Sequence, residues 1–224
     1  WAGNGVASAV KPPTGKKTGN RNCDVVEKRL CMMKLTHAYT EQTTFTNCVN
    51  KRMLHGGKKM EHQLDYQQAN GFDLHDWFAS GAREVAAHKK YLNDINVFPV
   101  ADGDTGTNLA TTLRAMVERP ARARSFADML QGISKSGLES ARGNSGIIFA
   151  SFVNGIAQEC PVAEVVDVRE FSGIAYRAVK HLYNAVDHPV EGTLMSIIRD
   201  WAMFLENNKD RFSGFRELFS NAYQ

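Results

Sequence analysis

Two aspartates separated by one glycine occur in the segment NVFPVADGDTGTNL, residues 96–109, just before a helical pattern begins. Asp102 and Asp104 could converge from a tight turn on Mg²⁺, a hard cation that takes oxygen ligands and is often shared with substrate phosphates. A calcium loop of the EF-hand type is excluded, because the twelfth position counted from Asp102 is Leu113 and not glutamate. The alternative is a solvated turn followed by a helix N-cap, and the spacing alone leaves both interpretations open.

The helix start that follows this turn carries groups that bind anions. The first N–H groups of a helix have no acceptor within it, and nearby hydroxyl and amide side chains add further donors. A glycine among them lets a ligand approach the backbone closely. We therefore predict phosphate contacts from Thr105, Gly106, Thr107 and Asn108.

Two more segments place small residues at a helix start. They are ARGNSGII, residues 141–148, and HPVEGTLMS, residues 188–196. The first is not a Walker A loop, because it lacks the Gly-Lys-Ser/Thr ending. Taken singly, each is better explained by close helix packing or simple capping. If the three helix starts lie at one end of a bundle and face the aspartates, they form a site for a magnesium–nucleotide complex. The candidate residues in these two segments are Gly143, Asn144, Ser145, Gly146, Thr193 and Leu194.

The elements that must position these residues are helices almost throughout from residue 60 onward. Apolar residues recur at helical spacing, which predicts an all-α bundle of about six or seven helices and no strand. Asp73 is the expected N-cap of the first helix, and Ser125 begins the third. Asp167 and Glu170 form a capping-box pattern for the fifth helix.

Residues 1–59 differ from the rest of the chain. They are rich in Gly, Lys, Asn and Thr and have no sustained apolar period, which predicts a disordered, non-globular extension. The segment HGGKKM, residues 55–60, back-translates to a purine-rich run like a bacterial ribosome-binding site before a start codon. We therefore interpret Met60 as the true start and residues 1–59 as translated leader, which leaves residues 60–224 as the folded domain.

Composition narrows the classes of function and the compartment. A formal net charge of +3 is too small to indicate nucleic acid as a partner. No apolar run approaches the roughly 20 residues that a membrane helix needs, so no stable membrane insertion is expected. Four cysteines without a CxxC pair favour neither a zinc site nor a disulfide framework, and this indicates a reducing cytoplasm.

Three segments carry a resemblance to a known family. In this order, INVFPVADGDTGTNL, ARGNSGIIFASFVNGIA and HPVEGTLMSIIRDWA resemble the nucleotide-binding domain that dihydroxyacetone kinase (its DhaL-type domain) shares with the ATP-binding component of bacterial fatty acid kinase. The resemblance covers roughly residues 72–205 and implies an antiparallel helical barrel that binds ATP at one end through Mg²⁺. NVFPV and PVEGT are similar to the fatty acid kinase branch, whereas a dihydroxyacetone-type protein is expected to place histidine where this chain has Thr105.

The resemblance also implies roles for individual residues. Asp102 and Asp104 would be the metal ligands and the catalytic pair, and Asn96 stands near a third aspartate of the dihydroxyacetone branch, as a further candidate ligand. Thr105 to Asn108 and Gly143 to Gly146 would contact the nucleotide phosphates. Thr193 and Leu194 would lie against the nucleoside.

The implied activity is a kinase reaction. It transfers the γ-phosphoryl group of ATP to the carboxylate of a fatty acid that a separate DegV-like carrier protein presents. The closing helix of the family and its later domains are not recognisable before Gln224, so we interpret residues 60–224 as a DhaL-type domain truncated at its C-terminus. We expect any homodimer to form through those missing domains. The alternatives are the ATP-binding part of a dihydroxyacetone kinase, a nucleotide-sensing domain without turnover, and a plain helical interaction domain.

Overall fold

The computed structural model describes residues 67–96, 101–185 and 192–222, so the expected leader and the start at Met60 lie outside the described residues. Within these ranges the chain forms eight helices and one two-stranded ribbon. The prediction of an all-α fold is confirmed. The elements are β1 (Gln68–Asn70), α3 (Gly71–Ala87), α4 (Lys89–Asp94), α5 (Thr105–Glu118), α6 (Phe126–Ser140), α7 (Gly143–Glu159), β2 (Val165–Asp167), α8 (Val168–Asn184), α9 (Leu194–Asn208) and α10 (Phe215–Ala222).

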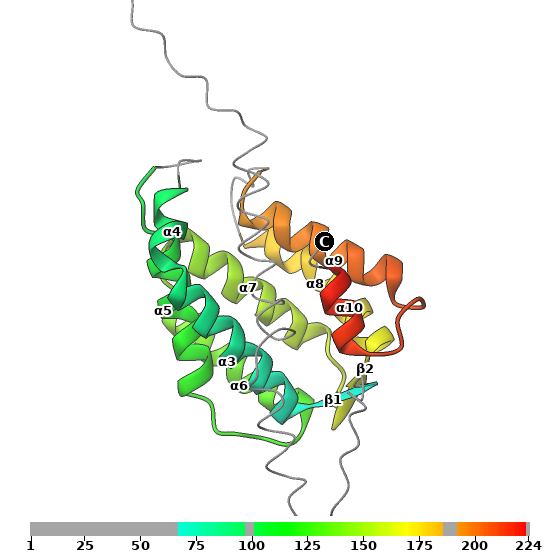
Figure 1. The fold of residues 1–224 in the computed structure, drawn as a ribbon. Helices are drawn as coiled ribbons and strands as arrows, with labels where there is room; N and C mark the ends of the chain where they lie inside the picture. The colour runs from blue at the N-terminus through cyan, green and yellow to red at the C-terminus, as the bar shows by residue number, and fades with distance from the viewer. Residues whose placement is uncertain (1–66, 97–100, 186–191, 223–224) are drawn as a thin grey trace, which may run out of the picture.

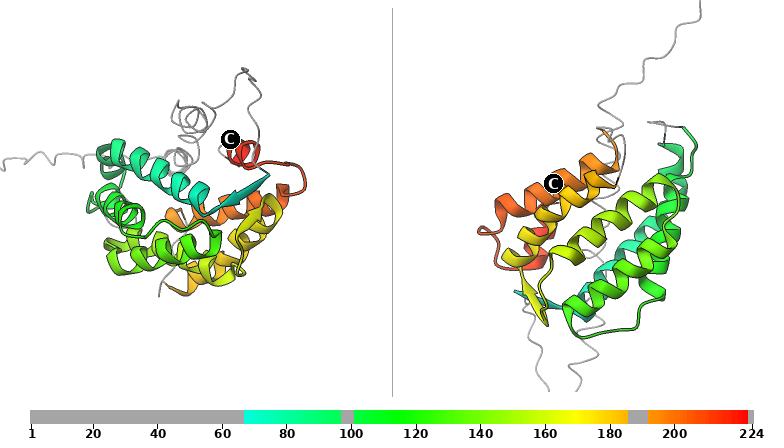
Figure 2. Two further views of the ribbon diagram at one scale, coloured as in Figure 1. Left: turned by 90° about the horizontal axis from the view of Figure 1, so that it is seen from below. Right: turned by 180° about the vertical axis from the view of Figure 1, so that it is seen from behind.

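Successive long helices run in opposite directions, so their starts alternate between two ends of the bundle (Figure 1). The helices α5, α7 and α9 begin at the end that also carries α4, which we call the upper end. The helices α3, α6 and α8 begin at the opposite, lower end, next to the ribbon. Figure 2 shows from below and from behind that the helices stand side by side around a common core. This alternation brings every second helix start to the same end, as the nucleotide-site hypothesis requires.

The ribbon corrects the prediction that the chain has no strand. β1 and β2 pair antiparallel, with Gln68 opposite Asp167 and Asn70 opposite Val165. Ala69, the central residue of β1, is fully buried. Strands of three residues are too short for an alternating pattern to be recognised, and the two partners lie far apart in the sequence. The pairing is a tertiary contact that no local pattern contains.

The first helix begins earlier than predicted. Its N-cap is Asn70 and not Asp73, because β1 ends there with the extended backbone that an N-cap needs. The Asn70 side chain accepts hydrogen bonds from the N–H groups of Phe72 and Asp73, at 2.8 and 3.3 Å. Asp73 accepts in return from the N–H of Asn70, at 2.9 Å, and so completes a capping box. The helix α3 ends at His88, and the short helix α4 begins directly after it.

The other predicted helix starts are confirmed. Ser125 caps α6, and Asp167 with Glu170 forms the capping box of α8. Thr193 caps α9 by accepting the N–H of Met195 at 3.4 Å. None of the described helices combines the length and the apolar character that crossing a membrane requires.

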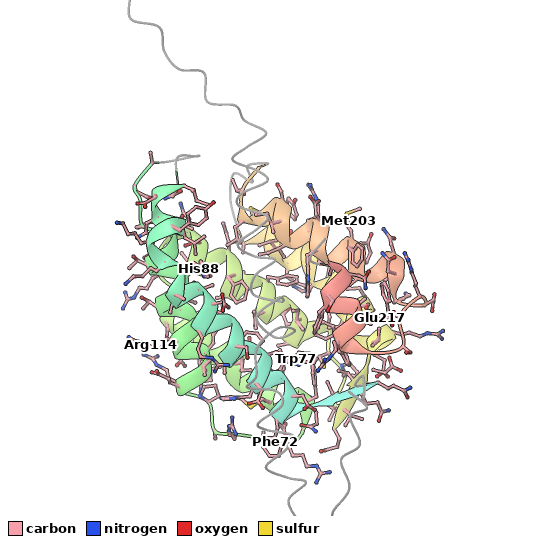
Figure 3. All side chains as sticks on the ribbon, in the orientation of Figure 1. Phe72, Trp77, His88, Arg114, Met203 and Glu217 are labelled. Atoms are coloured by element: carbon pink, nitrogen blue, oxygen red, sulfur yellow. The ribbon has the colours of Figure 1, made fainter. Side chains whose placement is uncertain are left out.

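An aromatic cluster in the lower half joins α3, α8, α9 and α10. Trp77 (Figure 3) has its ring centroid 4.9 Å from that of Phe215 and 5.1 Å from that of Phe219. Phe171 of α8 lies within 6.4 Å of both α10 rings, of Trp77 and of Trp201. These edge and tilted arrangements are the favoured geometries of packed rings. The short helix α10 is thereby fixed against α3 and α8 as well as against α9.

Candidate functional site

The acidic turn is exposed at the upper end. Both Asp102 and Asp104 are exposed, and Gly103 between them has φ +66°, a backbone conformation that favours glycine. Asn96, whose side chain is buried, donates from Nδ2 to Oδ1 of Asp102 at 2.5 Å. In this arrangement Asn96 orients Asp102, and its role as a metal ligand stays a prediction. The part of the connector between Asn96 and Ala101 lies outside the described residues.

The start of α5 follows directly on the acidic turn. Asp104 occupies the N-cap position, yet its side chain makes no capping hydrogen bond. The N–H of Thr107 donates to Oδ1 of Asn93 at 3.1 Å, so this predicted phosphate donor already has an acceptor. The N–H groups of Thr105 and Gly106 have no acceptor within the helix. Thr105 is half-buried and Gly106 is buried, so Thr105 is the more accessible of the two.

The start of α7 meets the start of α5, which the sequence placed 40 residues away. Oγ of Ser145 donates to the backbone oxygen of Thr105 at 3.2 Å, and Ser145 is buried. A Cβ atom at Gly143 would collide with the side chain of Asn108, and Gly143 has φ +55°. Two of the three predicted loops thus form one continuous surface. The Ser145 hydroxyl serves this packing.

The backbone around α7 is held by a second contact with α5. The N–H of Arg142 donates to Oγ1 of Thr112 at 3.2 Å, and a Cβ atom at Gly146 would collide with the same oxygen. Arg142 itself occupies the N-cap position of α7 and makes no side-chain capping bond. The first three N–H groups of this helix, which belong to Gly143, Asn144 and Ser145, therefore have no acceptor from their own cap.

The third loop reaches the same end of the bundle but is capped by its own side chains. Gly192 has φ +78° and donates its N–H to Oγ of Ser196 at 2.9 Å. Thr193 caps α9, as described above, and Leu194 is half-buried in the first position of that helix. The residues of this loop before Gly192 lie outside the described part of the chain. The upper end therefore combines two helix starts that lack a side-chain cap with one that has its own cap.

The residues present fit a magnesium–phosphate group. Exposed carboxylates stand beside helix starts whose N-cap side chains make no capping bond, and helix starts are general anion-binding positions. In the described ranges, no three His, Cys, Asp or Glu side chains gather closely enough to hold a metal ion by themselves. Mg²⁺ commonly takes one or two carboxylates and completes its coordination with substrate phosphates and water. Asp102 and Asp104 meet that requirement when a phosphate is present.

Sequence reasoning missed Asn93, which contacts Thr107 with both ends of its amide. Nδ2 of Asn93 donates to Oγ1 of Thr107 at 3.0 Å, while its Oδ1 accepts from the N–H of the same residue. An asparagine within a short apolar helical pattern gives no signal of such a contact. Only the return of α5 against α4 brings the two residues together.

A protein family and several relatives match this chain in sequence. A family model described as "DAK2 domain" matches residues 99–224. An uncharacterized protein of Mycoplasma pneumoniae is 31% identical over 153 residues, which are 64% of this chain and 27% of that protein. Protein YloV of Bacillus subtilis is 31% identical over 141 residues, 62% of this chain and 26% of its own length. An uncharacterized protein of Staphylococcus saprophyticus is 34% identical over 125 residues, 54% of this chain and 22% of its own length. The matched region spans about a quarter of each of these relatives.

Proposed function

The chain belongs to the DAK2 domain family, and from this premise we propose that its upper end binds Mg-ATP as the phosphoryl-donating domain of a kinase. The observation that carries the proposal is the contact between the starts of α5 and α7, beside two exposed carboxylates. Nucleotide binding is the function that the family membership supports directly. The acceptor, the partner and the placement in the cytoplasm are the further parts of the proposal.

Each part of the nucleotide has a counterpart in the site. Asp102 and Asp104 would hold Mg²⁺, which neutralises phosphate charge when bound. The N–H groups of Thr105 and Gly106 on α5, and of Gly143 to Ser145 on α7, would donate to phosphate oxygens. Thr193 and Leu194 at the start of α9 would lie against the nucleoside. Phosphoryl transfer depends mainly on such positioning and charge neutralisation, so no covalent catalyst is required of this domain.

We assign a fatty acid carboxylate as the acceptor, presented by a DegV-like carrier protein. A carboxylate oxygen would attack the γ-phosphorus, the bond from that phosphorus to the β–γ bridging oxygen would break, and acyl phosphate and ADP would result. A carboxylate is already ionised at neutral pH, so the domain needs no strong general base. Support comes from the similarity of NVFPV and PVEGT to the fatty acid kinase branch, and from Thr105 in place of the histidine expected of the dihydroxyacetone branch.

Calorimetric titration of the chain with Mg-ATP tests the nucleotide site. We expect Asp102→Asn or Asp104→Asn to weaken Mg-ATP binding by about tenfold or more, with unchanged helical content by circular dichroism. Asp128→Asn is the matched control, because Asp128 lies in the first turn of α6, at the lower end. Wild-type affinity in both site variants would remove these aspartates from the site.

The acceptor is tested in the longer protein that contains this domain. With ATP labelled at the γ-phosphate, the label is expected on a carrier-bound fatty acid and not on dihydroxyacetone. Labelling of dihydroxyacetone would assign the domain to the other branch. Binding of Mg-ATP without transfer to either acceptor would support a nucleotide-sensing role.

A further inference from the structure

The cap of α5 comes from outside the helix. An aspartate at an N-cap ordinarily accepts the N–H of the second or third helical residue with its own carboxylate. In α5 the third residue is Thr107, and its N–H donates to Oδ1 of Asn93 at 3.1 Å instead. The Nδ2 of Asn93 also donates to Oγ1 of Thr107 at 3.0 Å. The backbone of Asp104 is helical, at φ −116° and ψ −4°, and not extended as in an ordinary side-chain cap. Asn93 therefore supplies the capping bond that Asp104 does not make in this conformation.

Backbone packing fixes Asn93 in this position. A Cβ atom at Gly106 would collide with the backbone oxygen of Lys89 and would lie 2.7 Å from Cβ of Leu92. The absence of a side chain at Gly106 thus allows α4 to lie directly on the first turn of α5. Asn93 follows Leu92 in α4, so this close approach determines where its amide stands relative to Thr107.

A residue just after the C-terminal end of α4 contacts the other aspartate, Asp102. Asn96 stands three residues after Asn93 and donates to Oδ1 of Asp102, which leaves Oδ2 of that carboxylate for another partner. Asn96 is only 8% exposed, so its amide is held by its surroundings. Each aspartate of the acidic turn therefore depends on one asparagine. Asn93 makes a capping bond that leaves Asp104 without one, and Asn96 donates a hydrogen bond directly to Asp102.

We propose that Asn93 is a positioning residue that caps α5 in place of Asp104 and thereby keeps the Asp104 carboxylate available for a divalent cation. Asn96 is its counterpart and orients Asp102 toward the same cation. The cation part of this inference rests on the proposed Mg-ATP site, whereas the capping part concerns the free protein. The two parts are tested separately.

Thermal unfolding of the free protein tests the capping part. Asp104→Ala alone is expected to leave Tm nearly unchanged, because Asp104 makes no capping bond. Asn93→Ala alone should lower Tm only slightly, because Asp104, in an exposed turn, can then take the extended backbone of an N-cap and accept the N–H of Thr107. The double variant then has neither cap, and its Tm is expected to fall by about 2–4 °C more than the sum of the single shifts. If the Tm shifts of the two single variants add up to that of the double variant, Asn93 does not act in place of Asp104 as the cap.

The Mg²⁺ dependence of ATP affinity tests the cation part. Asn93→Ala is expected to reduce the gain in affinity that Mg²⁺ provides by about tenfold, with little change in the affinity for ATP without Mg²⁺. In an Asp104→Asn background, Asn93→Ala should cause no further loss, because the carboxylate through which it acts is gone. An equal loss in that background would refute the positioning role.

A second cycle distinguishes the two roles of Asn96. If it acts by orienting Asp102, Asn96→Ala adds no loss of Mg²⁺ dependence to Asp102→Asn, whereas a direct metal ligand would add one. Asn221→Ala, at an exposed hydrogen bond of α10, is the control for asparagine removal. If the wild-type chain itself does not bind Mg-ATP, the proposed function fails, and the unfolding experiment still decides whether Asn93 replaces Asp104 as the cap.

Discussion

The two ends of the bundle satisfy their helix starts in different ways. At the lower end, α3, α6 and α8 begin with Asn70, Ser125 and Asp167, and each of these side chains accepts an N–H of its own first turn. At the upper end, Thr193 caps α9 in the same way, but the N-cap residues of α5 and α7, Asp104 and Arg142, make no such bond. Self-capping typically contributes about 1 kcal/mol to stability. The three long helices that begin at the lower end are therefore all self-capped, whereas two of the three that begin at the upper end are not.

Backbone conformation and charge follow the same division. Among the described residues, the glycines with positive φ are Gly103, Gly143 and Gly192, and all belong to loops of the upper end. Arg142 places a cation at a helix N-terminus, where the helix dipole favours an anion. A cation at a helix N-terminus is unfavourable by itself and becomes favourable beside a bound anion. The comparison of the two ends thus supports a phosphate site at one of them.

The largest effect is expected at the lower end, from Phe171→Ala. Phe171 is 5% exposed and contacts rings from α3, α6, α9 and α10, so its removal leaves a cavity within the aromatic cluster. We expect the free energy of unfolding in urea to fall by about 3–5 kcal/mol. The affinity of the folded protein for Mg-ATP should stay unchanged. Tyr176→Ala, an exposed aromatic position on the same helix, is the control and should cost far less.

The next effect concerns the upper end and is tested with Gly143→Ala. The new Cβ would collide with Asn108 and would occupy a backbone conformation with φ +55°, so the start of α7 must move away from α5. We expect Mg-ATP affinity, measured by calorimetry, to fall by about tenfold or more. Asp167→Ala removes a cap at the lower end and should lower stability by about 1 kcal/mol without changing this affinity. Equal loss of affinity in both variants would erase the distinction between the ends.

The smallest effect concerns the pH dependence of stability. Glu159, at the end of α7 near the ribbon, accepts hydrogen bonds from His181, Lys180 and Arg177, which lower its pKa from 4.5 to about 2. Because the folded pKa is lower than the unfolded one, the ionised carboxylate stabilises the fold above about pH 4.5, and this stabilisation is lost as pH falls toward 2. The stability difference between wild type and Glu159→Gln should therefore shrink as the pH falls from about 4.5 toward 2. Glu118→Gln, whose carboxylate is largely exposed, should show no such trend.

The helix starts show which features a sequence can predict. Ser125, Asp167 and Thr193 were predicted because each is a capping residue directly before apolar residues at helical spacing, and that signal is local. Asp73 was misread as a cap because it also precedes an apolar period, but the strand before it extends the helix back to Asn70. Which residue type begins a helix is thus visible locally, whereas its position depends on the preceding element.

In the candidate site, the sequence predicted which loops take part but not how they contact one another. The residue types of the acidic turn and of the start of α7 identified both loops from sequence. The contact between Ser145 and Thr105 was conditional on the arrangement of the helices, and the structure supplies it. The role of Asn93 depends on the angle at which α4 meets α5, and the close approach at Gly106 sets that angle. The spacing of residues in the sequence does not predict the angle at which two helices cross.

The two-stranded ribbon also has a consequence for the entropy of the chain. Pairing Gln68 with Asp167 closes a loop of roughly 100 residues, which costs about 4 kcal/mol in chain entropy. A few hydrogen bonds between strands of three residues, each worth about 1 kcal/mol net, offset little more than this cost. The ribbon is therefore stable because the intervening helices already hold its two strands together. We expect it to form after the helices have packed and not to nucleate their folding.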